Sequence, residues 1–217
     1  MGGQDKQFAV LAGRPVLAWT VAAFEAAPEV DVIALVVNPA TADAVQTLGQ
    51  EMGWRKVVAY PPGGARRQDS CAHGLAALQA YGEAALELVL VHDGARPLVD
   101  GALIARGVAA ARAHGAAIPG VPARDTSKVV GADGRILHTP DRRQLWQVQT
   151  PQVFRAPLLA AAYAAAVERG LDVTDDAMLL EALDQPVYIF EGDPRNLKIT
   201  TPDDLAVATA WLGMREG

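Results

Sequence analysis

A short apolar run that breaks abruptly into polar residues, at positions 86–97, limits the folds open to this chain more than any other stretch. Residues 86–91 read Leu-Glu-Leu-Val-Leu-Val, a pattern that predicts a strand buried on both faces of a sheet. His-Asp-Gly-Ala-Arg-Pro follows directly. Ligands of open parallel sheets bind just beyond the carboxyl ends of the strands, so we expect Asp93 at a ligand-binding edge.

The residues that follow this strand suit a phosphorylated ligand. The Asp93 carboxylate can hold a hard cation such as Mg2+, which takes one or two protein carboxylates and completes its coordination with phosphates and water. Arg96 can offer its planar guanidinium to a phosphate group. An aspartate-capped turn followed by a solvated arginine is the alternative, and this stretch alone does not separate the two interpretations.

Strand-like and helix-like segments alternate along the chain, which predicts an α/β fold with a mainly parallel sheet flanked by helices. The 217 residues are expected to form a single domain. Thr174 is the expected cap of one helix and Thr201 that of the last helix. Strands are expected near residues 31–37, 56–60, 86–91, 116–121 and 186–191, and helices near 15–28, 40–52, 100–114, 156–169, 175–183 and 201–211. A further helix is expected to follow the glycine turn at 61–64, with Cys71, Leu75 and Leu78 on its inner face.

Residues 123–147 interrupt this alternation. Asp133-Gly134 is a hairpin-turn signal between two short strand-like runs. Because a lone hairpin is barely stable in water, we expect a projecting β-hairpin arm that packs on another surface, typically a second subunit. Its ends, at 123–126 and 140–143, would bring polar side chains together, with solvated salt bridges as the alternative.

Charge and composition exclude several classes of protein. The chain has 19 Lys and Arg against 25 Asp and Glu, a net charge of −6, so no broad basic face is available for nucleic acid. A single cysteine, Cys71, permits no disulfide framework and fits a reducing compartment, so we expect a cytoplasmic protein. No apolar run approaches the ~18 residues of a membrane span, and no signal peptide is recognisable.

Two further stretches are candidates for anion binding. Residues 63–70, Gly-Gly-Ala-Arg-Arg-Gln-Asp-Ser, lead into a helix N-terminus, which is a ready-made site for a nucleotide. A plain glycine turn with a helix cap fits this stretch equally well. Lys198 interrupts an apolar alternation, and a lysine that points inward there needs a partner such as a bound phosphate or Asp93. A surface lysine on an edge strand is the alternative.

Eight short motifs in one order carry a family resemblance. They are Asp-Lys-Gln-Phe (5–8), Gly-Gly-x-x-Arg-x-Asp-Ser (63–70), Val-His-Asp-Gly-Ala-Arg-Pro (91–97), Arg-Asp-Thr-x-Lys (124–128), Asp-Arg (141–142), Thr-Pro-Gln-x-Phe (150–154), Thr-Asp-Asp-Ala (174–177) and Asn-x-Lys-Ile-Thr-x-Pro-x-Asp-Leu (196–205). Together they resemble the 2-C-methyl-D-erythritol 4-phosphate cytidylyltransferases of the non-mevalonate isoprenoid pathway. The similarity extends from Met1 to about Trp211.

This resemblance implies a Rossmann-like, glycosyltransferase-A-like nucleotidyltransferase fold, a homodimer and a Mg2+ cofactor. The implied reaction joins CTP to methylerythritol phosphate and releases pyrophosphate. For the nucleotide, the matching motifs imply that Lys6 contacts the phosphates, that Gly63, Gly64 and Ser70 border the cytosine and ribose, and that Lys198 and, through Mg2+, Asp93 act at the α-phosphate. For the acceptor, they imply that Arg96 and Thr174 lie near the methylerythritol. Its phosphate would be held by Thr126, Arg142 and Thr150, with Arg142 reaching across from the other subunit's arm.

The chain departs from the family at its start. The family begins with a strand that ends in Pro-Ala-Ala-Gly-x-Gly-x-Arg-Met, and its glycine loop wraps the CTP phosphates, whereas this sequence starts where that motif ends. We expect either that the natural polypeptide begins earlier or that residues 1–11 rearrange to cover the gap. Two alternative functions stay open: a ribitol 5-phosphate cytidylyltransferase, and a non-catalytic dimer that binds a nucleotide weakly or not at all.

Overall fold

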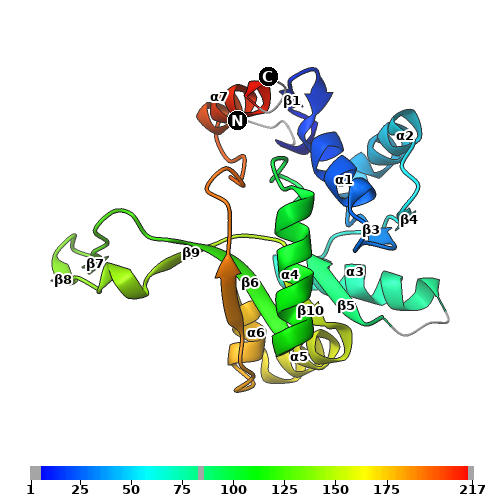
Figure 1. The fold of residues 1–217 in the computed structure, drawn as a ribbon. Coiled ribbons are helices and arrows are strands. Elements are labelled where there is room, and N and C mark those ends of the chain that lie inside the picture. The colour runs from blue at the N-terminus through cyan, green and yellow to red at the C-terminus, as the bar shows by residue number, and fades with distance from the viewer. Residues whose placement is uncertain (1–5, 83–85, 215–217) are drawn as a thin grey trace.

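A five-stranded mixed sheet lies at the centre of the computed structural model, which describes residues 6–82 and 86–214 (Figure 1). Its main strand order is β11-β6-β10-β5, and β9 pairs with the far end of β6. The strands are β5 (Leu88–Val91), β6 (Ala116–Pro122), β9 (Trp146–Val148), β10 (Gln152–Arg155) and β11 (Tyr188–Glu191).

The sheet confirms the α/β class and adds two strands, β9 and β10, that the alternation does not predict. β5, β6 and β11 run in one direction, because β10 is antiparallel to both β5 and β6 while β11 is parallel to β6. β10 opposes them because the chain leaves β6 through a hairpin excursion, without a crossover helix, and such an excursion returns antiparallel. Val153 and Phe154 of β10 are fully buried.

Helices cover both faces of this sheet. Successive β10 residues point to opposite faces: Val153 packs with Ala111 of α4 (Gly101–His114), and Phe154 packs with Leu159 of α5 (Ala156–Arg169). The short helix α6 (Ala177–Glu181) adds its apolar side chains to the α5 layer. The bounds of α5 agree with the predicted helix at 156–169.

The N-terminal part of the chain forms a second, smaller parallel pair. β3 (Ile33–Ala34) pairs with β4 (Val57–Ala59), both shorter than the predicted strands, and backbone hydrogen bonds continue the pairing as far as Val37. Helices α1 (Val16–Ala26), α2 (Ala42–Met52), with the turn η2 (Pro39–Thr41) before it, and α3 (Arg67–Tyr81) surround this pair. The glycine turn at 61–64 therefore connects β4 directly to the start of α3.

The structure corrects one helix cap and confirms another. Thr201 caps α7 (Pro202–Gly213), because its hydroxyl accepts a hydrogen bond from the Asp204 amide at 3.3 Å. Thr174 does not cap α6: its hydroxyl is directed to the Met178 sulfur, and the Asp175 carboxylate accepts the Met178 amide instead. The helix starts at Ala177, two residues later than predicted.

The first described residues form a small unit beside α7. η1 (Lys6–Phe8) is followed by β1 (Val10–Leu11) and β2 (Arg14–Pro15), which pair with each other. Within residues 6–15, neither strand joins the central sheet. Residues 1–5, which include Asp5 of the first motif, lie outside the described residues. The expected rearrangement of residues 1–11 can therefore be compared with the structure only over residues 6–11.

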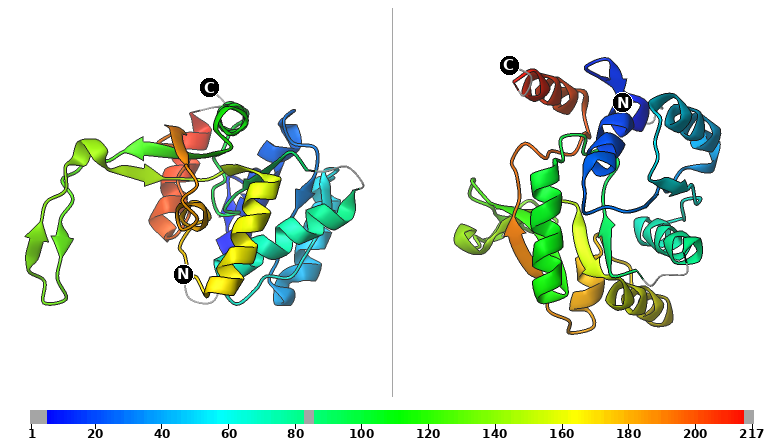
Figure 2. Two further views of the ribbon diagram at one scale, coloured as in Figure 1. Left: turned by 90° about the horizontal axis from the view of Figure 1, so that it is seen from below. Right: turned by 45° about the vertical axis from the view of Figure 1, so that its right-hand side comes forward.

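The predicted arm is present and projects from the domain (Figure 2). β7 (Val129–Val130) and β8 (Ile136–His138) form its hairpin, and η3 (Arg142–Gln144) lies on the return path. The two ends of the arm meet as expected, since Arg142 donates a hydrogen bond to the Arg124 carbonyl. Across residues 6–82 and 86–214, no helix is long and apolar enough to cross a bilayer.

Candidate active site

The Asp93 carboxylate lies just beyond β5 and is surrounded by three cationic side chains. Its Oδ2 atom is 3.2 Å from Lys198 Nζ and 3.3 Å from Arg96 Nε, and its Oδ1 atom is 3.8 Å from Arg67 Nε. Asp93 and Arg96 are largely buried, with side-chain exposures of 15% and 12%. Three cations therefore surround Asp93 at the predicted edge of the sheet, and one of them, Arg67, is also paired with Asp176, which leaves an excess of positive charge.

This charge imbalance keeps Asp93 ionised and favours an anionic ligand. Burial raises the pKa of the Asp93 carboxyl, but Lys198, Arg96 and Arg67 outweigh that effect, so the pKa lies below its ordinary value. Burial also lowers the pKa of Arg96. The excess positive charge in a partly desolvated site attracts a polyanion such as a nucleotide phosphate.

Backbone contacts hold Lys198 beside Asp93. The amide of Ile199 donates to the Ala95 carbonyl at 2.8 Å, and the Arg96 guanidinium donates to the Asn196 carbonyl at 2.8 Å. These bonds tie residues 195–200, an irregular segment and not an edge strand, to the loop after β5. Asp93, one of the two partners predicted for Lys198, contacts it in the structure.

Thr150 makes a hydrogen bond to the backbone of Asp93. Its hydroxyl accepts a hydrogen bond from the Asp93 amide at 3.1 Å and lies 2.9 Å from His92 Nδ1. Burial lowers the pKa of His92 to about 4, so the neutral ring accepts the Thr150 proton, and its Nε2 faces the Arg96 carbonyl at 3.3 Å. Because the hydroxyl proton is already used here, the predicted contact of Thr150 with a substrate phosphate stays a prediction.

The glycine turn packs tightly against the first turn of α3. The Gly64 amide donates to Ser70 Oγ at 2.9 Å, and a Cβ at Gly64 would lie 2.4 Å from the Cβ of Asp69, so a side chain there has no room. Gly63 approaches the same Ser70 hydroxyl. The turn is next to Asp93 because Arg67, the first residue of α3, reaches that carboxylate.

η1 lies beside the loop that follows β5. Gln7 approaches Gly94 so closely that a Cβ at Gly94 would be 3.4 Å from its amide nitrogen, and Thr20 donates to the Gly94 carbonyl at 2.9 Å. Lys6, the residue before Gln7, is exposed. The structure therefore brings the Lys6 turn to the same edge as Asp93, while the role of Lys6 on a nucleotide stays a prediction.

Three predicted residues remain, and two of them lie on the arm. Thr126 and Arg142 lie on the arm, which carries them away from the central sheet, and both are exposed (Figure 2). Thr174 is exposed just before α6. Within one chain, the arm carries Thr126 and Arg142 away from the cationic group around Asp93, whereas Thr174 lies two residues before Asp176, the ion-pair partner of Arg67.

Three residues for which the sequence predicts no role complete the site. Arg67 and Asp176 form an ion pair of 2.6 Å, and the hydroxyl of Tyr163 donates to the same carboxylate at 2.7 Å. Arg67 and Asp176 both lie within motifs of the family resemblance. The only local sequence signal of a buried carboxylate is the pair of adjacent acids, Asp175 and Asp176, before an apolar run. Their pairing cannot be read from the sequence, since α3 and α6 are far apart in the chain.

Comparison with known proteins gives one consistent result. The family model described as "2-C-methyl-D-erythritol 4-phosphate cytidylyltransferase" matches residues 1–214. The enzyme of that name from Dehalococcoides mccartyi is 47% identical over 212 residues, covering 98% of this chain and 90% of that protein. Its namesake from Desulforamulus reducens is 45% identical over 215 residues, covering 97% and 88%.

Solved structures agree with these sequence relatives. The crystal structure of the 2-C-methyl-D-erythritol 4-phosphate cytidylyltransferase from Thermus thermophilus matches with a TM-score of 0.78 and 38% identity, covering 96% of this chain and 94% of that one. The 4-diphosphocytidyl-2C-methyl-D-erythritol synthase from Anaerococcus prevotii matches with a TM-score of 0.86 and 32% identity, covering 95% and 93%. This chain therefore belongs to the 2-C-methyl-D-erythritol 4-phosphate cytidylyltransferase family.

Proposed function

We propose that this protein transfers the CMP group of CTP to 2-C-methyl-D-erythritol 4-phosphate and releases pyrophosphate. Its family membership carries the assignment. The structural observation that supports it best is the Asp93 carboxylate held among three cations at the end of β5. The relatives named above favour methylerythritol phosphate over the ribitol phosphate alternative.

The chemistry needs positioning and charge stabilisation more than a nucleophilic side chain. An oxygen of the methylerythritol phosphate attacks the α-phosphorus of CTP, and the bond from that phosphorus to the pyrophosphate oxygen breaks. The attacking phosphate is already ionised, so no strong general base is required. Lys198 and Arg96 can stabilise the negative charge that grows around the phosphorus. Burial raises the pKa of Cys71, the single thiol, to about 12, which leaves it unsuited to nucleophilic attack.

A Mg2+ cofactor belongs to this proposal. Across the described ranges, no group of three or more metal-binding side chains occurs, and Asp93 is the carboxylate that would hold the ion. One carboxylate fits Mg2+ because substrate phosphates and water complete its coordination. When bound, the ion would neutralise charge on the triphosphate, while Arg96 holds the Asp93 carboxylate in place.

The remaining roles follow the family resemblance. Gly63, Gly64 and Ser70 would border the cytosine and ribose, and Lys6 would contact the phosphates from η1. The closeness of the glycine turn and of η1 to Asp93 supports this division of the site. Arg96 would lie near the methylerythritol. A cytoplasmic location is part of the proposal, since a single cysteine suits a reducing compartment.

The arm is proposed to embrace a second copy of the chain and to form a homodimer. It presents several large apolar side chains to solvent, and exposed apolar patches often mark protein–protein interaction sites. The exposed large apolar residues of this segment are Val129, Val130, Ile136, Leu137 and Trp146. In such a dimer Thr126 and Arg142 would reach the partner's site and hold the substrate phosphate there.

A pyrophosphate-release assay with Mg2+ tests the proposal. We expect turnover with CTP and methylerythritol phosphate, and little turnover when ribitol 5-phosphate replaces the acceptor or when ATP replaces CTP. Faster turnover with ribitol 5-phosphate would replace the proposed substrate. Calorimetric titration with CTP and Mg2+ covers the remaining alternative, since binding without turnover on either acceptor would identify a non-catalytic nucleotide-binding protein.

A further inference from the structure

Arg67 connects two carboxylates that belong to different parts of the fold. Its Nη1 atom is 2.6 Å from Asp176 Oδ2, and its Nε atom is 3.8 Å from Asp93 Oδ1. Arg67 begins α3, Asp176 precedes α6, and Asp93 follows β5. One guanidinium therefore bridges a fully buried acid and the acid at the centre of the candidate site.

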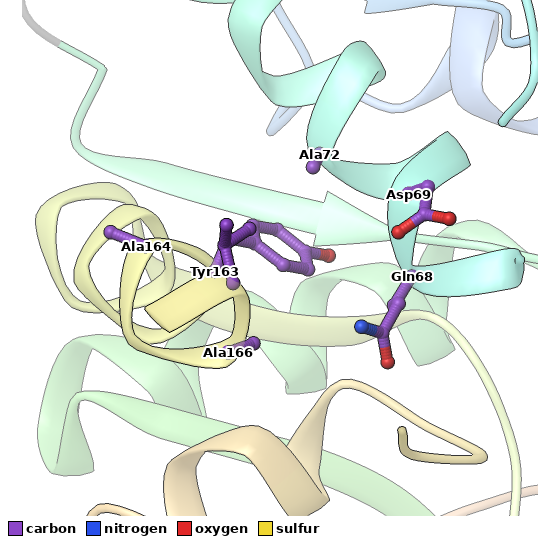
Figure 3. Close-up of a pocket in the computed structure, with 7 residues that line it drawn as sticks. Gln68, Asp69, Ala72, Tyr163, Ala164 and Ala166 are labelled. Atoms are coloured by element: carbon purple, nitrogen blue, oxygen red, sulfur yellow. The ribbon is translucent and has the colours of Figure 1, made fainter. Parts of the chain in front are cut away.

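Asp176 has the properties of a fixed anchor. Its side chain has 0% exposure, and burying a carboxylate is costly unless it is paired and hydrogen-bonded. Tyr163 donates to its Oδ1 at 2.7 Å, and its backbone amide donates to the side-chain oxygen of Gln152 at 3.2 Å. Figure 3 shows the Tyr163 ring between α5 and α3, with its hydroxyl directed toward the first turn of α3.

The arrangement restricts Arg67 more than a surface ion pair would. Burial and the adjacent Asp176 raise the pKa of Tyr163, so its hydroxyl stays protonated and keeps donating to the carboxylate. Both oxygens of Asp176 are therefore occupied, one by Tyr163 and the other by Arg67. With Nη1 fixed at Asp176, the planar guanidinium presents its Nε edge to Asp93.

We propose that Asp176 is a positioning residue for the transfer reaction, which acts by fixing Arg67 against the Asp93 carboxylate. Lys198 and Arg96 hold one oxygen of Asp93, and Arg67 faces the other, so the carboxylate is restrained from both sides. Asp176 is completely enclosed and does not itself touch substrate. The kinetic test of this inference rests on the proposed cytidylyltransferase function, whereas its structural test depends on the geometry alone.

A double-mutant cycle gives the kinetic test. Arg67→Gln and Asp176→Asn are each expected to lower kcat about 10-fold or more, and the double variant should be no slower than the slower single variant, because the two residues act as one unit. The KM for CTP should change much less than kcat. Multiplicative losses in the double variant, or an unchanged kcat in Asp176→Asn, would overturn the proposal.

A matched control and a second variant separate positioning from folding. Asp172 is an exposed acid in the same loop, 3.8 Å from Arg66, and Asp172→Asn should leave kcat unchanged. If Asp176→Asn does not fold, Tyr163→Phe removes only the hydroxyl that steadies Asp176. Tyr163→Phe should lower kcat in the parent and have no further effect in the Arg67→Gln background. An equal loss in both backgrounds would mean that Tyr163 acts independently of Arg67.

An activity-independent measurement distinguishes failure of this inference from failure of the proposed function. The Arg67 Nε–H signal in an NMR spectrum can be assigned by its loss in Arg67→Gln. In Asp176→Asn we expect its hydrogen exchange to accelerate about 10-fold or more, because the guanidinium is released into solvent. Unchanged exchange would refute the anchoring by Asp176 even in a protein without turnover, whereas accelerated exchange without turnover would refute only the proposed reaction.

Discussion

Lys198 Nζ lies 3.2 Å from Asp93 Oδ2, which joins the loop after the central strand to an irregular segment near the end of the chain. The pair is only partly shielded, since the Lys198 side chain is 45% exposed while that of Asp93 is 15% exposed. An exposed ammonium can leave a carboxylate for a substrate phosphate at small cost. Lys198 can therefore turn to the nucleotide while the more buried Arg96 keeps its contact with the same Asp93 oxygen.

Asp93→Asn tests the centre of the site. The substitution keeps the shape of the side chain and removes the charge that faces Lys198, Arg96 and Arg67, so turnover should fall ~100-fold or more, as on the loss of a main electrostatic stabiliser. Steady-state pyrophosphate release at saturating Mg2+ measures it. Asp203→Asn, at an exposed acid in the first turn of α7, is the matched control. Parent-like activity in Asp93→Asn would show that this carboxylate does not hold the metal.

His92 should make the stability of the fold depend on pH. Its pKa is about 4 in the folded protein against 6.5 in the unfolded chain, so this residue's contribution is complete above pH 6.5 and is lost as the pH falls toward 4. From pH 7 to pH 5 the parent should lose about 2 kcal/mol of unfolding free energy through His92. Urea unfolding at the two pH values measures the loss.

His92→Asn should flatten this pH dependence, because an amide oxygen can accept the Thr150 hydroxyl proton without titrating. His138→Asn, at an exposed position of the arm, should leave the dependence as in the parent. If His92→Asn and the parent lose equal stability between pH 7 and pH 5, another group must account for the loss.

Thr150 links this histidine to the active site. Thr150→Val removes the hydroxyl while nearly keeping the volume, which leaves the Asp93 amide and His92 Nδ1 without their shared partner. Unfolding free energy should fall by about 1–3 kcal/mol, and kcat should fall with it, because the Asp93 backbone is no longer fixed. Thr150→Ser keeps the hydroxyl and should recover most of both. A rise in the KM for methylerythritol phosphate alone, with normal stability, would favour direct phosphate binding by Thr150.

The strand ends could be predicted from sequence because they follow from a local pattern. The apolar run before Asp93 predicts β5, and the rule that ligands gather at strand ends then places Asp93 in the site. β10 was not predicted because it begins with a polar residue, Gln152, and its direction depends on the arm that precedes it. The Arg67–Asp176 pair was not predicted because only the folded chain brings α3 and α6 together.

The last prediction concerns the arm and the association of two copies of the chain. Its exposed apolar side chains should be covered by a second subunit, so light scattering at micromolar concentration should give the mass of a dimer. Arg142 lies in η3, on the return path of the arm that projects from the domain, and would serve the partner's site. Asp93→Asn and Arg142→Ala should therefore each be inactive alone.

Mixing the two inactive variants then decides where Arg142 acts. In a hybrid dimer, one site combines the intact Asp93 of one subunit with the intact Arg142 of the other, while the second site carries both defects. Random exchange makes about half of the dimers hybrid, each with one working site, so the mixture should regain about a quarter of the parent activity if Arg142 acts across the interface. Exchange is verified separately by mass spectrometry of differently labelled subunits. Exchange without recovered activity would show that Arg142 serves its own chain or takes no part in the reaction.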